Sequence, residues 1–220
     1  MTRTSGKLLG NDQFRECLER AMTWYGVDRA GFDQKDLLPM AAVLAAQITG
    51  VTKRPGEKKP RICINGMEKD KNRKMAKKYL MRRIRVHPEE CMVDLYCYSG
   101  QSDPFLPILT MECEGHAGHS KDVTPRASSE TCDYLWDLFK LIQVPSPLRI
   151  FLAICTEKKR SLLEKQVGAM VRNYGDILKR DCGEVFAVIF PETKLTGKTI
   201  MVQGWTYPKG KKETRWIPDK

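Results

Sequence analysis

The segment Leu148–Cys155 constrains the fold most, because seven of its eight residues are apolar. Such a strand is typical of the middle of a sheet that is covered on both faces. Amphipathic helical patterns lie before it, at about 129–142, and after it, at about 158–179, and a further apolar strand is predicted at 185–190. The sequence therefore predicts an α/β fold, with α+β as the alternative, built on a mixed central β-sheet flanked by helices.

The N-terminal half begins with two helical patterns. One follows Asn11 as N-cap and ends near Gly26, and the other runs over about 36–48 with Pro39 in its first turn. The further expected elements are a loop at 51–60, a short strand at 61–64, a basic helix at 71–85, strands at 91–98 and 105–113, and a possible edge strand at 199–205.

The chain is expected to form one domain over residues 1–220. Its expected parts are an N-terminal helical layer (1–50), a basic segment (53–85), a core (91–190), and a C-terminal strand with a basic tail (195–220).

Length and composition exclude several classes of protein. With 220 residues, 41% of them hydrophobic, the chain can bury a substantial core, which excludes global disorder. No apolar run approaches the ~18 residues of a membrane-spanning helix, and the polar start of the chain does not predict a secretory signal peptide. Eight scattered cysteines without a C-x-x-C pair favour a reducing, cytoplasmic compartment.

The positive charge is concentrated in one segment. The chain has a net charge of +11, and residues 53–85 hold 14 Lys and Arg against 3 Asp and Glu, so this segment accounts for the whole excess. A local basic excess indicates a polyanionic partner, most often nucleic acid, and its alternative is a solvated basic helix without a specific ligand.

Three acids stand where apolar residues are expected. Asp94 lies within a strand-like run, and Glu112 and Glu114 end the next one, where alternation places both on one face. If the two strands pair as a hairpin, the three carboxylates converge, and burying them without a cation is costly. Mg²⁺ (or Mn²⁺) suits such ligation. The alternative is that Asp94 and Glu114 are strand-end residues that face water.

These residues and their surroundings resemble the PD-(D/E)xK nuclease superfamily, whose fold is restriction-endonuclease-like. The resemblance covers about residues 91–190: Asp94, a loop, the strand ending in Glu112-x-Glu114, the helical run 133–142, and Pro145-Ser146-Pro147 leading into the buried strand. An N-terminal helix often supplies a further acid in this family, for which Glu16 and Glu19 are equal candidates.

The chain departs from the family pattern at two positions. Val93 replaces a proline, and Glu114 stands where the family usually has lysine. One possibility is that Glu114 binds metal or acts as a base. A second is that the cationic role has moved to Lys140 or Lys121. A third is that the site is degenerate and no longer cuts.

The resemblance implies a metal-dependent endodeoxyribonuclease. Asp94 and Glu112 would coordinate Mg²⁺, and Glu114 would bind a second ion or deprotonate the attacking water. The basic helix would hold the phosphate backbone of double-stranded DNA through Lys74, Lys77, Lys78, Arg82 and Arg83. Enzymes of this type often act as dimers, so a homodimer is a further expectation.

Other motifs allow more than one interpretation. Cys113, His116 and His119 follow a zinc-like spacing, but a fourth ligand is missing, so the two histidines are expected to contact substrate phosphate or to be ordinary loop residues. The aromatic and basic tail would stack bases or pack on the body; packing is favoured for Trp205, and both uses stay open for Trp216. Two rival functions stay open: a non-catalytic nucleic-acid-binding protein, and a protein whose basic segment docks an acidic partner.

Overall fold

The computed structural model describes residues 9–25, 34–52, 60–64, 85–87, 92–98, 107–115, 131–180, 183–192, 200–206 and 210–216. The helices in these ranges are α1 (Asn11–Tyr25), α3 (Gln34–Thr52), α5 (Cys132–Gln143), α6 (Glu157–Asn173) and α7 (Gly175–Arg180). The strands are β1 (Arg61–Ile64), β2 (Arg85–His87), β3 (Leu95–Tyr98), β4 (Leu109–Glu114), β5 (Leu148–Cys155), β6 (Glu184–Pro191), β7 (Ile200–Thr206) and β8 (Gly210–Trp216).

The described strands form one mixed sheet of eight strands in the order β2-β1-β3-β4-β5-β6-β7-β8. Its centre is parallel, because β5 pairs in parallel with β4 on one side and with β6 on the other. β3, β7 and β8 join by antiparallel pairing, and β1 pairs antiparallel with β3 and parallel with β2. All eight residues of β5 are buried, which confirms the predicted central strand.

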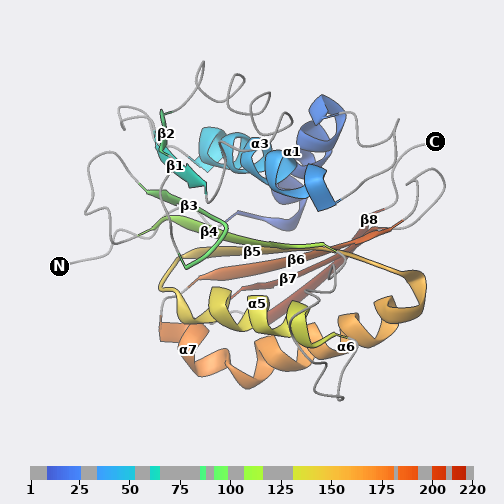
Figure 1. The fold of residues 1–220 in the computed structure, drawn as a ribbon. Coiled ribbons are helices and arrows are strands. Elements are labelled where there is room, and N and C mark those ends of the chain that lie inside the picture. Colours follow the sequence, from blue (N-terminus) through green and yellow to red (C-terminus); the bar gives the residue numbers. More distant parts are fainter. Residues whose placement is uncertain are drawn as a thin grey trace.

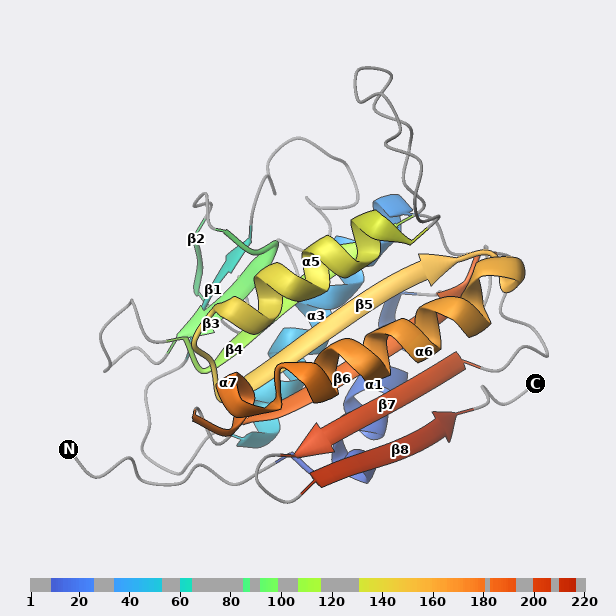
Figure 2. The ribbon, with the colours of Figure 1, turned by 90° about the horizontal axis from the view of Figure 1, so that it is seen from below.

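Helices cover both faces of the sheet, as predicted (Figure 1). α5 connects β4 to β5, and α6 with α7 connects β5 to β6. Right-handed crossovers between neighbouring parallel strands place these helices on the same face. α1 and α3 lie on the other face, and Figure 2 shows α5 and α6 running along the parallel strands. Each face has its own buried hydrophobic cluster.

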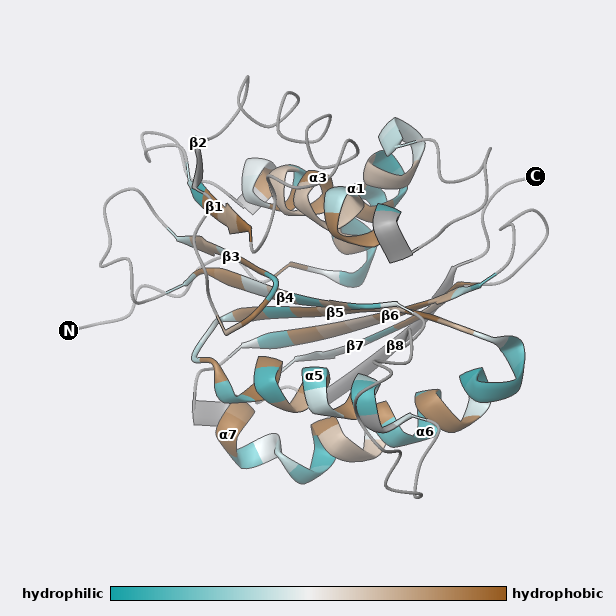
Figure 3. Cartoon of the chain, viewed as in Figure 1, coloured by the Kyte–Doolittle hydropathy of each residue, from teal (hydrophilic) through white to brown (hydrophobic). Residues whose placement is uncertain are grey.

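The sequence pattern of each helix matches its environment. α3 is buried around most of its circumference from Leu37 to Ile48, as expected for a helix that is apolar on every side. α6 buries a single stripe, formed by Leu163, Val167, Gly168 and Val171. Figure 3 shows the contrast: hydrophobic residues run through α3, whereas hydrophobic and hydrophilic residues alternate along α5 and α6.

Several predicted boundaries differ from the structure. α3 begins at Gln34, so Pro39 lies in its second turn and not in its first. Arg85 lies in β2 and not in a basic helix, because its backbone pairs with β1; residues 71–84 are outside the described ranges. The predicted helix at 158–179 is divided into α6 and α7 at Tyr174, which lies between Asn173 and Gly175, both poor helix formers.

Three strand predictions also need correction. Asp94 does not lie within a strand but directly before β3, because the β3–β4 ladder begins at Leu95. β4 begins at Leu109, later than predicted. β7 is not an edge strand, since β8 pairs along its whole length; the polar composition of β8 gave no strand signal.

Gly204 of β7 has a specific packing role. It pairs with Phe186 of β6, whose ring stacks on Phe14 of α1 with a centroid distance of 4.1 Å. A Cβ atom at position 204 would lie 2.8 Å from Cε1 of Phe186 and 3.0 Å from Oδ1 of Asn11. The absence of a side chain at Gly204 therefore lets α1 approach the sheet.

We predict that Gly204→Ala lowers the free energy of unfolding by about 1–3 kcal/mol, because the ring of Phe186 has to move. The control is Gly168→Ala in α6, where the new methyl group meets only the flexible side chain of Arg172. This control is expected to be neutral or stabilising by up to ~1 kcal/mol. Urea unfolding measures both; equal effects of the two substitutions would contradict the packing role.

Candidate active site

The β3–β4 hairpin brings Asp94 and Glu112 together. Leu95 pairs with Met111, so the antiparallel register continued by one residue places Asp94 opposite Glu112. The two carboxyl groups are near enough for the charge of Asp94 to act on Glu112. The backbone N–H of Cys113 donates to Oδ2 of Asp94 at 2.9 Å. The carboxylate of Asp94 thus accepts a hydrogen bond from the backbone of β4 just beyond the end of the β3–β4 ladder.

Glu112 carries its carboxyl group into the interface between β4 and α5. It pairs with Phe151 of β5, which belongs to the hydrophobic cluster on the α5 face of the sheet. Only 1% of its surface is exposed. Burial, and next the charge of Asp94, raise the pKa of Glu112 to about 9, although Lys140 acts in the opposite direction. At neutral pH the carboxyl group of Glu112 is therefore mainly protonated.

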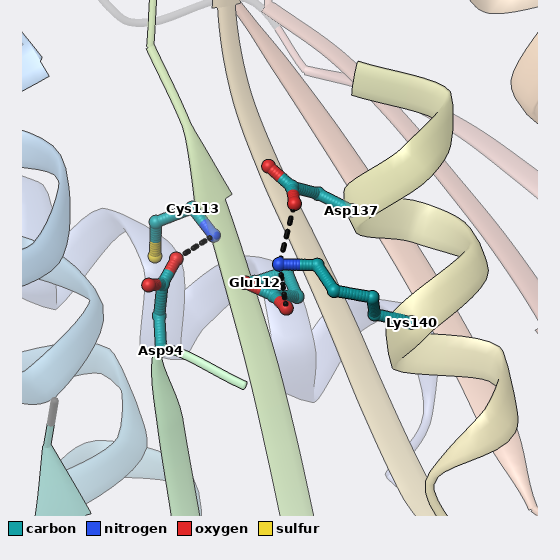
Figure 4. A network of polar contacts seen from close by, with 5 residues as sticks. All are labelled: Asp94, Glu112, Cys113, Asp137 and Lys140. Atoms are coloured by element: carbon teal, nitrogen blue, oxygen red, sulfur yellow. Dashed lines mark hydrogen bonds and ion pairs between the residues drawn. The ribbon is translucent and has the colours of Figure 1, made fainter. Parts of the chain in front are cut away.

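Lys140 of α5 provides the positive charge beside this pair (Figure 4). Its Nζ lies 3.1 Å from Oε1 of Glu112 and 2.6 Å from Oδ1 of Asp137. Oε1 of Glu112 is buried without a well-oriented hydrogen bond among the described residues, so its contact with Nζ is mainly electrostatic.

The two acids also keep Lys140 charged. Burial alone lowers the pKa of Lys140. The hydrogen bond to Asp137 and the electrostatic interaction with Glu112 outweigh burial, so the pKa is raised. Lys140 is therefore a permanent cation at neutral pH and is unsuited to act as a base.

Glu114 is next on the same face of β4, as the alternation predicted. Its nearest acidic neighbour is Asp137 of α5, rather than Asp94. Burial, followed by the proximity and charge of Asp137, raises the pKa of Glu114 to about 9. Glu114 is thus a protonated partner of Asp137 at neutral pH.

Buried polar contacts fix both ends of α5 and so determine where its side chains reach. Near the N-terminus, the hydroxyl of Tyr134 donates to the carbonyl of Ile154 in β5 at 2.8 Å. Near the C-terminus, the fully buried Arg149 of β5 donates to the carbonyls of Leu141, Val144 and Ser146. Between these anchors, the spacing of three residues places Asp137 and Lys140 on the side of α5 that faces β4.

We call these five groups the carboxylate–lysine cluster: Asp94, Glu112, Glu114, Asp137 and Lys140. The raised pKa values of Glu112 and Glu114 and the ammonium group of Lys140 limit the net charge of this partly buried site. Within the described ranges, no group of three His, Cys, Asp or Glu side chains is arranged to hold a metal ion. The Asp94–Glu112 pair offers two hard oxygen ligands, and two carboxylates are the usual protein share of a Mg²⁺ site.

The structure gathers part of the predicted site. Asp94, Glu112 and Lys140 lie together, and Glu114 joins them through Asp137. The remaining predicted residues lie outside the described ranges: Lys74, Lys77, Lys78, Arg82, Arg83, His116, His119 and Lys121.

Two N-terminal candidates lie away from the cluster. Glu16 and Glu19 belong to α1, on the opposite face of the sheet, where they form exposed ion pairs with Arg20 and Arg15. Neither contributes to the carboxylate–lysine cluster.

Sequence reasoning missed Asp137. Its position three residues before the candidate Lys140, on the same predicted helix, was the available signal, since residues at this spacing are neighbours on a helix surface.

Comparison with protein-family models, with curated proteins and with solved structures finds no match to this chain. None of the described helices is long and apolar enough to cross a membrane.

We predict that the free energy of unfolding of Glu112→Gln, relative to that of the wild type, increases as the pH rises. Between its ordinary value of 4.5 and about 9, the carboxyl group is protonated in the folded chain and ionised in the unfolded chain. The wild type therefore loses stability with rising pH, by at most ~1.4 kcal/mol per pH unit, whereas glutamine carries no such proton.

Urea unfolding in EDTA at pH 5.5 and 7.5 measures this difference. Glu19→Gln on the exposed surface of α1 is the matched control, for which the difference from wild type is expected to be equal at both pH values. If Glu112→Gln also differs from the wild type by the same unfolding free energy at pH 5.5 and 7.5, the raised pKa of Glu112 is contradicted.

Proposed function

We propose that this protein is a metal-dependent endonuclease that hydrolyses phosphodiester bonds in DNA, with a restriction-endonuclease-like fold and a PD-(D/E)xK-type site. One observation carries the proposal: the half-buried Asp94 lies beside the buried Glu112, and Nζ of Lys140 lies 3.1 Å from Glu112. Two acids and one lysine in contact are the set of groups that the resemblance calls for.

The surrounding elements support the proposal. The acids lie at the start of β3 and at the carboxyl end of β4, and α5 and the buried β5 follow in the order that the resemblance implies. The carboxyl ends of parallel strands are where open α/β sheets commonly bind ligands.

Lys140 accounts for the unusual Glu112-x-Glu114 motif. The family pattern places lysine at the position of Glu114, but here a lysine reaches Glu112 from α5. Of the two cations considered from the sequence, Lys140 is the one within the described residues, and its contact favours a transfer of the cationic role to α5.

Asp94 and Glu112 would hold Mg²⁺ or Mn²⁺, with water and phosphate oxygens as the other ligands. The buried oxygen Oε1 of Glu112, without a well-oriented hydrogen bond in the described residues, suits this use. When bound, the ion would polarise the phosphodiester group and lower the pKa of a water molecule.

The side chains have distinct roles in this proposal. Lys140 keeps its positive charge and stabilises negative charge that develops on the phosphate. Glu114 is the candidate to orient the attacking water; it would deprotonate that water only once it has lost its own proton, for example when a nearby metal ion lowers its raised pKa. Residues 53–85 supply the positive charge that would hold the DNA backbone without reading its sequence.

We predict that the wild type nicks or linearises plasmid DNA with Mg²⁺ or Mn²⁺ and that EDTA abolishes cleavage. Asp94→Asn and Lys140→Gln are each expected to reduce the cleavage rate at least ~100-fold, because each removes a charge that acts on the reacting phosphate. Glu19→Gln, on the opposite face of the sheet, is the matched control and should cleave as the wild type does.

The outcomes separate this proposal from its rivals. Salt-dependent DNA binding without cleavage would support a non-catalytic nucleic-acid-binding protein. Weak binding even at low salt would support a protein whose basic segment docks an acidic partner. Parallel reactions with RNA test the choice of substrate.

A further inference from the structure

Lys140 is held from two sides. Its side chain is 29% exposed, whereas those of Glu112 and Asp137 are 1% and 14% exposed. Lysine has a long, flexible side chain with a strong preference for water, and a partly exposed ammonium group can leave a single buried partner. Its shortest ion-pair contact, 2.6 Å, is with Asp137, three residues earlier on α5.

Asp137 also has a neighbour on β4. Its carboxyl group acts on that of Glu114, which lies two residues after Glu112 on the same face of the strand. The ion-pair contacts run from Asp137 to Lys140 and from Lys140 to Glu112. Asp137 and Lys140 thus both lie on α5, on the side that faces Glu112 and Glu114 of β4.

We propose that Asp137 is a positioning residue that holds Nζ of Lys140 against Glu112. Asp137 acts through Lys140 and does not itself contact the substrate or a metal ion. The consequence for catalysis rests on the proposed nuclease function, whereas the consequence for the ammonium group of Lys140 does not.

The main alternative is that Asp137 acts independently, as a further metal ligand or as a structural residue of α5. The two cases differ in their coupling to Lys140. A positioning residue loses its effect when the group that it positions is gone, whereas an independent ligand keeps its effect.

A double-mutant cycle tests the catalytic consequence. Asp137→Asn keeps the shape of the side chain but removes its charge, and it should lower kcat by about 10–100-fold with little change in KM, because Lys140 is misplaced. In the Lys140→Gln background, the same substitution should change kcat less than ~3-fold. Asp137→Glu, which restores the carboxylate, should recover activity above that of Asp137→Asn. An undiminished effect of Asp137→Asn in the Lys140→Gln background would overturn the proposal.

A second measurement is independent of cleavage. The rate at which acetic anhydride modifies Lys140, followed by mass spectrometry, should rise severalfold in Asp137→Asn, because the freed amine reaches solvent. Lys165, exposed on α6, serves as the internal reference and should react equally in both proteins. An unchanged rate at Lys140 would overturn the positioning role.

The two measurements also separate the two proposals. If the wild type cuts no DNA but modification of Lys140 still accelerates in Asp137→Asn, the nuclease proposal fails and the positioning role of Asp137 stands. If the wild type cuts DNA but Lys140 is modified equally fast in Asp137→Asn, the nuclease proposal stands and the positioning role of Asp137 fails.

Discussion

The buried carboxyl group of Glu112 is the constraint on which this side of the molecule depends. An isolated charge at that depth costs several kcal/mol, so the group needs a proton, a cation or both. A raised pKa lets Glu112 keep a proton beside Asp94, which directly precedes β3, and Lys140 brings a positive charge from α5. A natural sequence keeps such an arrangement at a cost in stability, which is typical of functional sites.

The scaffold holds the groups of this cluster in place. The two parallel crossovers put α5 and α6 on one face of the sheet, and a separate hydrophobic cluster packs α1 and α3 on the other. Tyr134 and Arg149 then fix the two ends of α5 through hydrogen bonds to backbone carbonyls. Because α5 cannot easily rotate or slide, Asp137 and Lys140 stay directed at β4.

The sequence predicted the features that depend on local periodicity. The apolar run of β5 and the two-residue alternation of β4 were sufficient to place a central strand and to orient Glu112 and Glu114. The association of Glu114 with Asp137 depends on the rotation and anchoring of α5, which are tertiary properties. β8 was missed because its polar residues lack the alternation of a half-buried strand. Asp94 was assigned to a strand because the apolar residues around it hide the point where backbone pairing ends.

We propose that Asp94 and Glu112 bind a metal ion together, and anomalous scattering from a crystal soaked in Mn²⁺ tests this most directly. We expect an anomalous peak at coordination distance from carboxylate oxygens of both Asp94 and Glu112, and we expect Asp94→Asn to abolish it. A fully soaked crystal with no peak at this pair, or with Mn²⁺ bound only elsewhere, would contradict it.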